Sequence, residues 1–172
     1  MRTSRQPVRS LDRLDRRILA LLQADGRMSM KDLAEAVGLT ITPCIERVKR
    51  LERDGVIMGY HARLNPVLLG SALLVFVEIT LRDKSGNMFE QFRREVLRIP
   101  EVLECHLVSG DFDYLIKARI REIGEYRRLL GDILLQLPGA AQSKSYVVME
   151  EIKETLAISV EEKAPAAGAG RI

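Results

Sequence analysis

The chain has 172 residues, enough for one medium domain or two small ones. Hydrophobic residues make up 47% and charged residues 30%, as in an ordinary globular protein, and no stretch approaches the ~20 apolar residues that span a membrane. The net charge of +3 is unevenly distributed, because residues 1–65 carry 13 Lys and Arg against 8 Asp and Glu (+5), whereas residues 66–172 carry 14 against 16 (−2). The basic first part indicates a polyanionic partner.

The cysteine and histidine content limits the chemistry of the chain. Cys44 and Cys105 lie far apart beside apolar residues, so they are interpreted as small buried side chains in a reducing compartment. With His61 and His106 they are too few for a structural zinc site, and no cofactor is expected. The basic start of the sequence precedes no apolar segment, so no secretory signal is expected and the predicted location is cytoplasmic.

Residues 1–10 show no hydrophobic periodicity and are expected to form a disordered basic arm. A first helix is predicted after Asp12, a suitable N-cap, because leucine and isoleucine then recur at helical spacing. A second, short helix is predicted between Ser29 and Gly38, since glycine is a common residue at helix C-termini.

A third helix is predicted from Thr40 to Asp54-Gly55. Residues 56–64 alternate in polarity and predict a small β-ribbon, which Asn65-Pro66 terminates. Three short helices followed by a ribbon are typical of a winged helix-turn-helix, whose third helix enters the major groove of DNA.

The outward face of the third helix combines hydroxyls near its start with cations further along. Hydroxyls and arginine can contact base edges, lysine and arginine neutralise phosphates, and the free N–H groups at the helix start suit a phosphate. The residues predicted to bind double-stranded promoter DNA are Thr40, Thr42, Pro43, Arg47, Lys49 and Arg50.

The second half of the chain contains strand, helix and strand twice over. Pro100 and Pro138-Gly139 end the two helices. This order predicts an α+β domain of the βαββαβ, ferredoxin-like type, with both helices on one face of an antiparallel sheet. The other face needs a cover, for which a second copy of the chain is the candidate. Strands are predicted at residues 73–81, 102–108, 114–120 and 145–152, and helices around residues 89–97 and 126–137.

The predicted organisation has four parts. The basic arm, residues 1–10, precedes a DNA-binding domain at residues 11–65. An oligomerisation and effector-binding domain follows at residues 66–156. Residues 157–172 are rich in Ala and Gly towards their end and are expected to form a flexible tail.

Several long strings resemble the Lrp/AsnC family of transcriptional regulators, which includes the leucine-responsive regulatory proteins. The similarity covers roughly residues 11–154. The strings that carry it are residues 38–52 (GLTITPCIERVKRLE), 57–60 (IMGY), 64–66 (LNP), 74–81 (LVFVEITL), 104–114 (ECHLVSGDFDY) and 146–151 (YVVMEE).

The resemblance implies a global regulator of amino-acid metabolism genes that responds to leucine and associates with the nucleoid. It also implies dimers that assemble into octamers or larger rings with DNA wrapped around them. The effector residues that the resemblance implies are Val75, Leu107, Gly110, Asp111, Asp113, Tyr146, Val147 and Val148. A carboxylate could pair with the ammonium of the amino acid, backbone N–H groups could hold its carboxylate, and valines could line an aliphatic pocket.

Two other classes of protein share features with this sequence. Haem-pathway decarboxylases have a similar fold and use histidines, but here one histidine lies in the middle of a strand and the other in the wing, without a paired acid and base. A nucleoid-organising protein with little sequence preference would share the wing and the cations, so the sequence leaves this alternative open.

Overall fold

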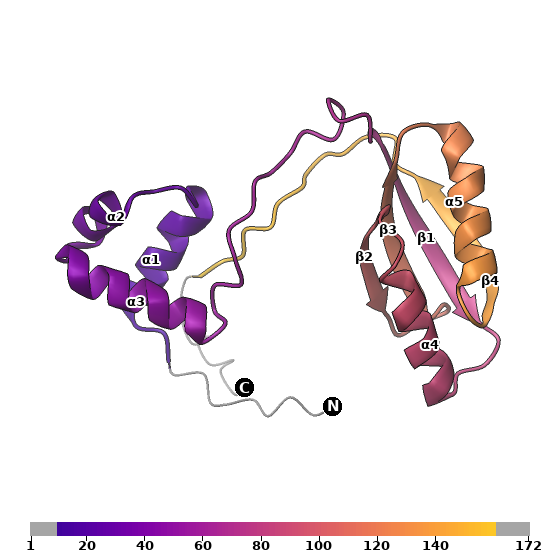
Figure 1. Ribbon diagram of the computed structural model, residues 1–172, viewed down its shortest axis with the longest axis horizontal. Coiled ribbons are helices and arrows are strands. Elements are labelled where there is room, and N and C mark those ends of the chain that lie inside the picture. The colour runs from indigo at the N-terminus through magenta and orange to yellow at the C-terminus, as the bar shows by residue number, and fades with distance from the viewer. Residues whose placement is uncertain (1–9, 161–172) are drawn as a thin grey trace, which may run out of the picture. The chain divides into compact units, whose positions relative to one another are not determined.

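The computed structural model describes residues 10–160, apart from the side chains of residues 132–136. The described residues form two compact units (Figure 1), one comprising residues 10–63 together with residues 155–160, the other Leu64–Glu154. Residues 1–9 of the expected arm and 161–172 of the expected tail lie outside the described residues. The tail expected from residue 157 is wrong for residues 157–160, because hydrogen bonds join them to the N-terminal unit.

The N-terminal unit contains three helices: α1 (Arg13–Ala24), α2 (Met30–Val37) and α3 (Ile41–Arg53). Asp12, Ser29 and Thr40 occupy the N-cap positions as predicted, and Gly38 ends α2 with φ +71°, a left-handed conformation that glycine adopts without strain. The helices enclose a core formed by Ile18, Leu19, Leu22, Leu33, Ala34, Val37, Cys44, Val48 and Leu51.

A buried carboxylate joins α1 to α3. Asp15 is 1% exposed, and its Oδ1 accepts hydrogen bonds from Nη2 of Arg50 and, at 2.8 Å, from Nη1 of Arg47. Arg47 also binds Asp12 at 2.6 Å, and Asp12 and Asp15 form a reciprocal capping box. One acidic cluster therefore caps α1 and holds α3 against it.

The β-ribbon predicted at residues 56–64 is wrong. Residues 54–57 form turns and residues 58–65 belong to no strand, since no neighbouring segment supplies a hydrogen-bonded ladder. Val56 and Ile57 instead donate their N–H groups to the carbonyl of Leu51 and pack against the helical core.

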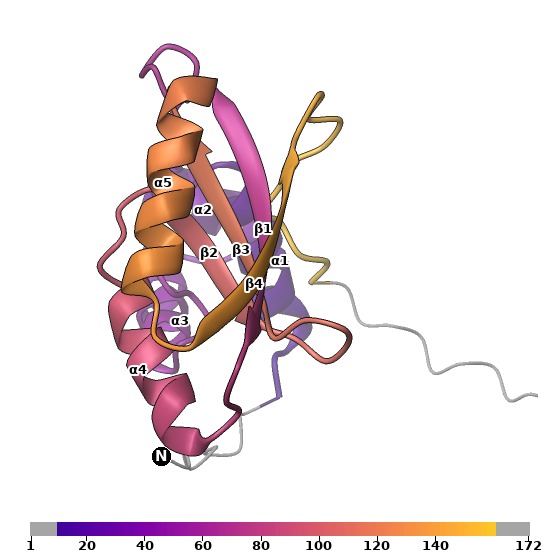
Figure 2. The ribbon, with the colours of Figure 1, turned by 90° about the vertical axis from the view of Figure 1, so that its right-hand side faces the viewer.

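The C-terminal unit has the predicted βαββαβ order. Its strands are β1 (Leu73–Leu81), β2 (Val102–Leu107), β3 (Tyr114–Ile120) and β4 (Ala140–Val147), and its helices are α4 (Gly86–Val96) and α5 (Ile123–Gln136). The sheet is antiparallel, its order is β2-β3-β1-β4, and both helices cover the same face (Figure 2).

The last strand begins and ends five residues earlier than predicted. Gly139 adopts φ +75° and accepts a hydrogen bond from the N–H of Arg82, which starts β4 directly after α5. β4 pairs with β1 alone, so its polar stretch at residues 142–145 is tolerated at a sheet edge although it does not resemble a buried strand.

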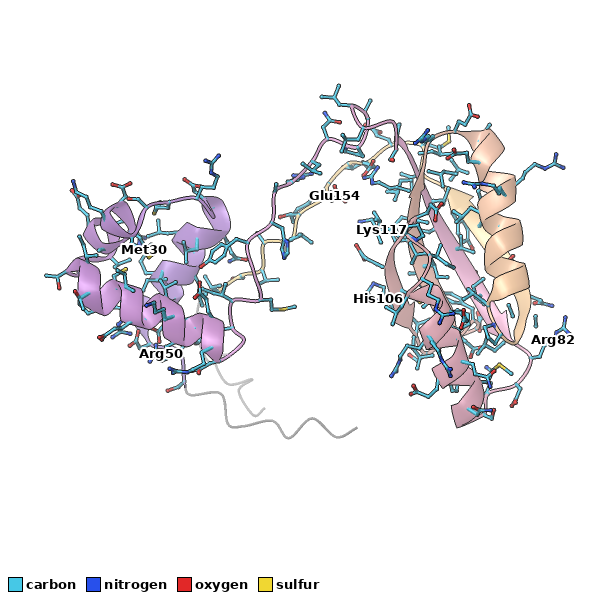
Figure 3. All side chains as sticks on the ribbon, in the orientation of Figure 1. Met30, Arg50, Arg82, His106, Lys117 and Glu154 are labelled. Carbon is cyan, nitrogen blue, oxygen red and sulfur yellow. The ribbon has the colours of Figure 1, made fainter. Side chains whose placement is uncertain are left out.

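The two faces of the sheet differ in polarity. Alternate residues of β1 and β3 point towards the helices and form the core, in which Phe92 stacks on Tyr114 at 3.9 Å between ring centroids. The other face carries charged side chains. Lys117 binds Glu104 and Glu154, each at 3.1 Å, and Figure 3 labels Lys117 and Glu154. None of the described helices combines the length and apolar character needed to cross a bilayer.

We predict that Asp15→Ala destabilises the N-terminal unit by about 2–3 kcal/mol, because it removes the carboxylate that Arg50 binds, leaves Arg47 with Asp12 alone, and breaks the capping box. Urea unfolding followed by circular dichroism measures the loss. Glu35→Ala, an exposed site on α2, is the control and is expected to change the stability by less than about 0.5 kcal/mol. Equal stability of the two variants would show that the ion pairs do not hold α3.

Candidate functional sites

The exposed side of α3 is a stripe of polar residues. Thr42, Glu46, Lys49 and Arg53 are spaced four, three and four residues apart, so they share one face of the helix, and all four are exposed. Lys49 and Arg53 carry positive charge along this stripe, and Thr42 places a hydroxyl near its start. We call these four residues the α3 stripe.

The start of α3 offers free donors. Thr40 is the N-cap, but its side chain makes no capping hydrogen bond, and Thr40 and Thr42 are both exposed. Pro43 lies in the first turn of the helix, where backbone N–H groups have no acceptor within the helix. The proline therefore breaks no helical hydrogen bond. The N-terminal N–H groups of the helix and the two hydroxyls can therefore contact an anion.

Two of the residues predicted to contact DNA have a different environment. Arg47 and Arg50 turn towards α1, with side chains 27% and 24% exposed, and both bind Asp15. Hydrogen bonds to Asp12 and then to Asp15 raise the pKa of Arg47, so its charge is held in the ion pairs. The sequence analysis did not identify Asp15 as a partner of these two arginines.

The predicted effector residues fall into two groups along the chain. Asp113 is the centre of the first group, which also contains Leu107, Gly110 and Asp111. It is 6% exposed; its Oδ2 accepts a hydrogen bond from the N–H of Leu81 at 2.8 Å, and its Oδ1 binds Nζ of Lys84 at 2.9 Å. The turn that precedes it contains Gly110, with φ +146°, and the exposed Asp111, and Leu107 is exposed at the end of β2. The sequence analysis did not identify Lys84, which follows the first predicted strand of this unit and precedes its first predicted helix.

Burial raises the pKa of Asp113, but the Leu81 N–H and the hydrogen bond and charge of Lys84 outweigh it, so the net shift is downward. The carboxylate is therefore ionised at neutral pH. Since the folded pKa is lower than the ordinary value of 3.8, this carboxylate stabilises the unit in full above that pH. The contribution is lost as the pH falls through the lowered pKa.

The second group lies towards the other end of the sheet. Val147 pairs with Val75, and Tyr146 pairs with Phe76, whereas Tyr114 beside the turn pairs with Ile79. Ile79 lies four positions after Val75 on β1, a distance of roughly 13 Å along the strand. One chain therefore does not bring the two groups together.

The members of this second group differ in accessibility. Val75 is fully buried in the core of its own unit, so the structure does not place it in a pocket as predicted. Tyr146 and Val147 are exposed, and the hydroxyl of Tyr146 donates to Glu78 at 3.0 Å. Val148 donates its N–H to the carbonyl of Leu74 and is half-buried.

The described residues offer little for covalent or metal chemistry. Burial raises the pKa of the Cys105 thiol to about 11 and also raises that of Cys44, so both thiols stay protonated at neutral pH. Within residues 10–160, no three His, Cys, Asp or Glu side chains gather as a metal site would require.

Two family models match the chain, one over the three helices and one over the βαββαβ sheet unit and the four residues that follow it. Residues 11–58 match the winged helix-turn-helix DNA-binding model, and residues 74–158 match the Lrp/AsnC ligand-binding domain. The chain therefore has a DNA-binding unit and an amino-acid-binding unit, as the fold and the resemblance predicted.

Known proteins that are similar over most of the chain agree. The leucine-responsive regulatory protein of Escherichia coli K12 is 54% identical over 153 residues, covering 89% of this chain and 93% of that protein. The protein of the same name from Serratia marcescens is 55% identical over 151 residues, covering 88% and 92%.

Solved structures show the same architecture. A transcriptional regulator of Neisseria meningitidis in complex with L-Met superposes with a TM-score of 0.81 at 34% identity, covering 87% of this chain and 96% of that chain. An AsnC family regulator of Agrobacterium tumefaciens gives 0.81 at 37% identity, covering 86% and 95%. The chain belongs to the Lrp/AsnC family, whose members are DNA-binding transcriptional regulators and not enzymes.

Proposed function

We propose that this regulator responds to leucine, controls genes of amino-acid metabolism, and wraps DNA as a homo-oligomer in the cytoplasm. The observation that supports DNA recognition by α3 is the exposure of the α3 stripe. Asp15 binds Arg47 and Arg50 on the other side of the helix and leaves the stripe accessible. Leucine as the effector is supported by the names of relatives that share 54% and 55% of their residues with this chain.

The polar residues of α3 have two different roles in DNA binding. Thr42 and Lys49 are exposed and can reach base edges or phosphates, whereas Arg47 and Arg50 act through their ion pairs with Asp15 and position the helix. Thr40 and Pro43 at the helix start suit a phosphate. This assignment revises the equal roles that the sequence predicted for the three cations.

Asp113 and Lys84 indicate how an amino acid could bind. Oδ1 of Asp113 already holds an ammonium, that of Lys84, whose side chain is 61% exposed. The ammonium of free leucine can displace it, and the backbone of the Gly110 turn can take the leucine carboxylate. Because Tyr146 and Val147 lie too far along the sheet in the same chain, they would complete the site from a neighbouring copy.

Exposed apolar side chains support self-association. Such side chains on a monomer usually mark a surface that another protein covers. They occur on both segments that connect the units, at Leu64, Val67, Leu68, Leu69, Met149, Ile152 and Leu156. We propose dimers that assemble into octamers or larger rings.

We predict that Lys49→Ala weakens promoter binding and lowers the slope of log affinity against log salt by about 1, if Lys49 contacts a phosphate. If Lys49 contacts a base, the variant loses roughly 1–3 kcal/mol and preference at one base pair. Fluorescence anisotropy with promoter and random DNA at several salt concentrations separates these results.

Lys153→Ala, an exposed lysine of the C-terminal unit, is the matched control for this measurement. Unchanged binding by Lys49→Ala would remove the α3 stripe from the interface. Equal affinity of the wild-type chain for promoter and random DNA would instead favour the nucleoid-organising function.

We predict that Asp113→Asn weakens leucine binding about tenfold to a hundredfold, because one charge-assisted hydrogen bond of ~1.5–3 kcal/mol is lost. Asparagine keeps an oxygen for the Leu81 N–H, so the fold survives. Lys84→Met removes the competing ammonium and should tighten leucine binding. Calorimetry measures both, with Glu122→Gln as control, and normal affinity of Asp113→Asn would exclude the carboxylate as the ammonium partner.

We predict that the purified full chain sediments as a dimer or larger species at micromolar concentration, since its exposed apolar segments require a partner. Leucine should shift the distribution between assemblies, because an effector acts through its differential affinity for two states. Analytical ultracentrifugation with and without leucine tests this, and a monomer under both conditions would contradict the proposed assembly.

A further inference from the structure

The chain returns to the N-terminal unit at its C-terminal end. The side-chain amide of Gln23 on α1 pairs with Ile158 in both directions: Nε2 donates to the Ile158 carbonyl at 2.9 Å, and Oε1 accepts from the Ile158 N–H at 2.8 Å. This arrangement imitates the pairing of two strands, with a glutamine side chain in place of a second backbone.

A second anchor follows two residues later. Nη1 of Arg16, also on α1, donates to the carbonyl of Val160 at 2.9 Å. The half-buried Val160 side chain packs against the core of the three helices. Residues 155–160, which we call the latch, are therefore held by two side chains of α1 and by one apolar contact.

The surface of α1 suits an extended segment. Ala20, Gln23 and Ala24 share one face of the helix, since they are three and four residues apart, and they line a hollow with residues 157–160. The two alanines are small enough for a backbone to approach. Ile158 is 74% exposed, so α1 binds its backbone and not its side chain.

The segment just before the latch is fixed to the other unit. Glu151 binds Arg119 of β3 through both carboxylate oxygens, at 3.0 and 2.6 Å, and Glu154 binds Lys117 at 3.1 Å. Three residues, 155–157, connect Glu154 to Ile158. The residues anchored on the sheet and the residues anchored on α1 are therefore close neighbours in the chain.

We propose that the latch transmits the state of the ligand-binding unit to the DNA-binding unit. The matched ligand-domain model includes residues 155–158, yet these residues lie in the unit that carries α3. From α1 the effect reaches α3 through the bonds of Asp15 to Arg47 and Arg50. The occupant of the α1 surface is the chain's own C-terminal segment, and its response to leucine rests on the proposed function.

Gln23→Ala in the full chain tests the docking. Alanine favours the helix, so α1 stays folded, while both hydrogen bonds to Ile158 are lost. Hydrogen exchange of a peptide covering residues 155–160 should become faster by about 5- to 100-fold. Gln23→Glu keeps an acceptor for the Ile158 N–H but sets a carboxylate oxygen against the Ile158 carbonyl, so exchange should again be faster than in the wild type. Gln142→Ala, an exposed glutamine of β4, is the matched control and should change nothing.

Transmission is tested on the same variants. Gln23→Ala should bind leucine as the wild type does, but the change in promoter affinity caused by leucine should fall towards onefold. A chain that ends at residue 154 should behave like Gln23→Ala, and one that ends at residue 160 like the wild type.

Three results overturn the proposal or part of it. Exchange in residues 155–160 that is as fast in the wild type as in Gln23→Ala overturns the docking. A full leucine response in Gln23→Ala overturns transmission. If the wild type binds promoter DNA but does not respond to leucine, the proposed effector is wrong, and transmission fails with it, while the exchange measurement still decides whether the latch docks.

Discussion

The position of α3 depends on one buried carboxylate. Asp15 is enclosed between two helices and neutralised by Arg47 and Arg50, because a buried charge without partners would cost several kcal/mol. The same pairs keep two of the four basic side chains of α3 away from the solvent, so the outer face is left to Thr42, Glu46, Lys49 and Arg53. The proposed DNA contacts and the ion pairs that stabilise the helical unit thus lie on different sides of one helix.

Local signals in the sequence were sufficient for most of the fold. Caps at Asp12, Ser29 and Gly38 and the apolar periodicity of β1 are short-range features, and the structure confirms them. The errors concern long-range pairing. The ribbon at residues 56–64 has no partner strand, and β4 starts early because Gly139 turns the chain at once. Periodicity describes one segment and does not reveal what a distant segment offers it.

The candidate sites show the same limit. Helical geometry correctly placed Thr42 and Lys49 on the outside of α3, but the partners of Arg47 and Arg50 lie more than thirty positions away, at Asp15. Similarly, the turn around Asp113 was recognised, whereas its pairing with Lys84 and the Leu81 N–H depends on how β1 and β3 align. Tyr146 and Val147 remain predicted effector residues, which strand register separates from that turn within one chain.

The pairing of Gln23 with Ile158 joins residues 135 positions apart, and this has a consequence for synthesis. During synthesis the three helices emerge from the ribosome early, but the latch, residues 155–160, emerges only after the whole ligand-binding unit. Closing so long a loop is entropically unfavourable in an unstructured chain and becomes much less so once the sheet unit has folded, because the Val148 N–H then binds the carbonyl of Leu74 near the start of that unit. The helical unit is therefore completed last, although it is encoded first, and a truncated nascent chain would carry α3 without its final support.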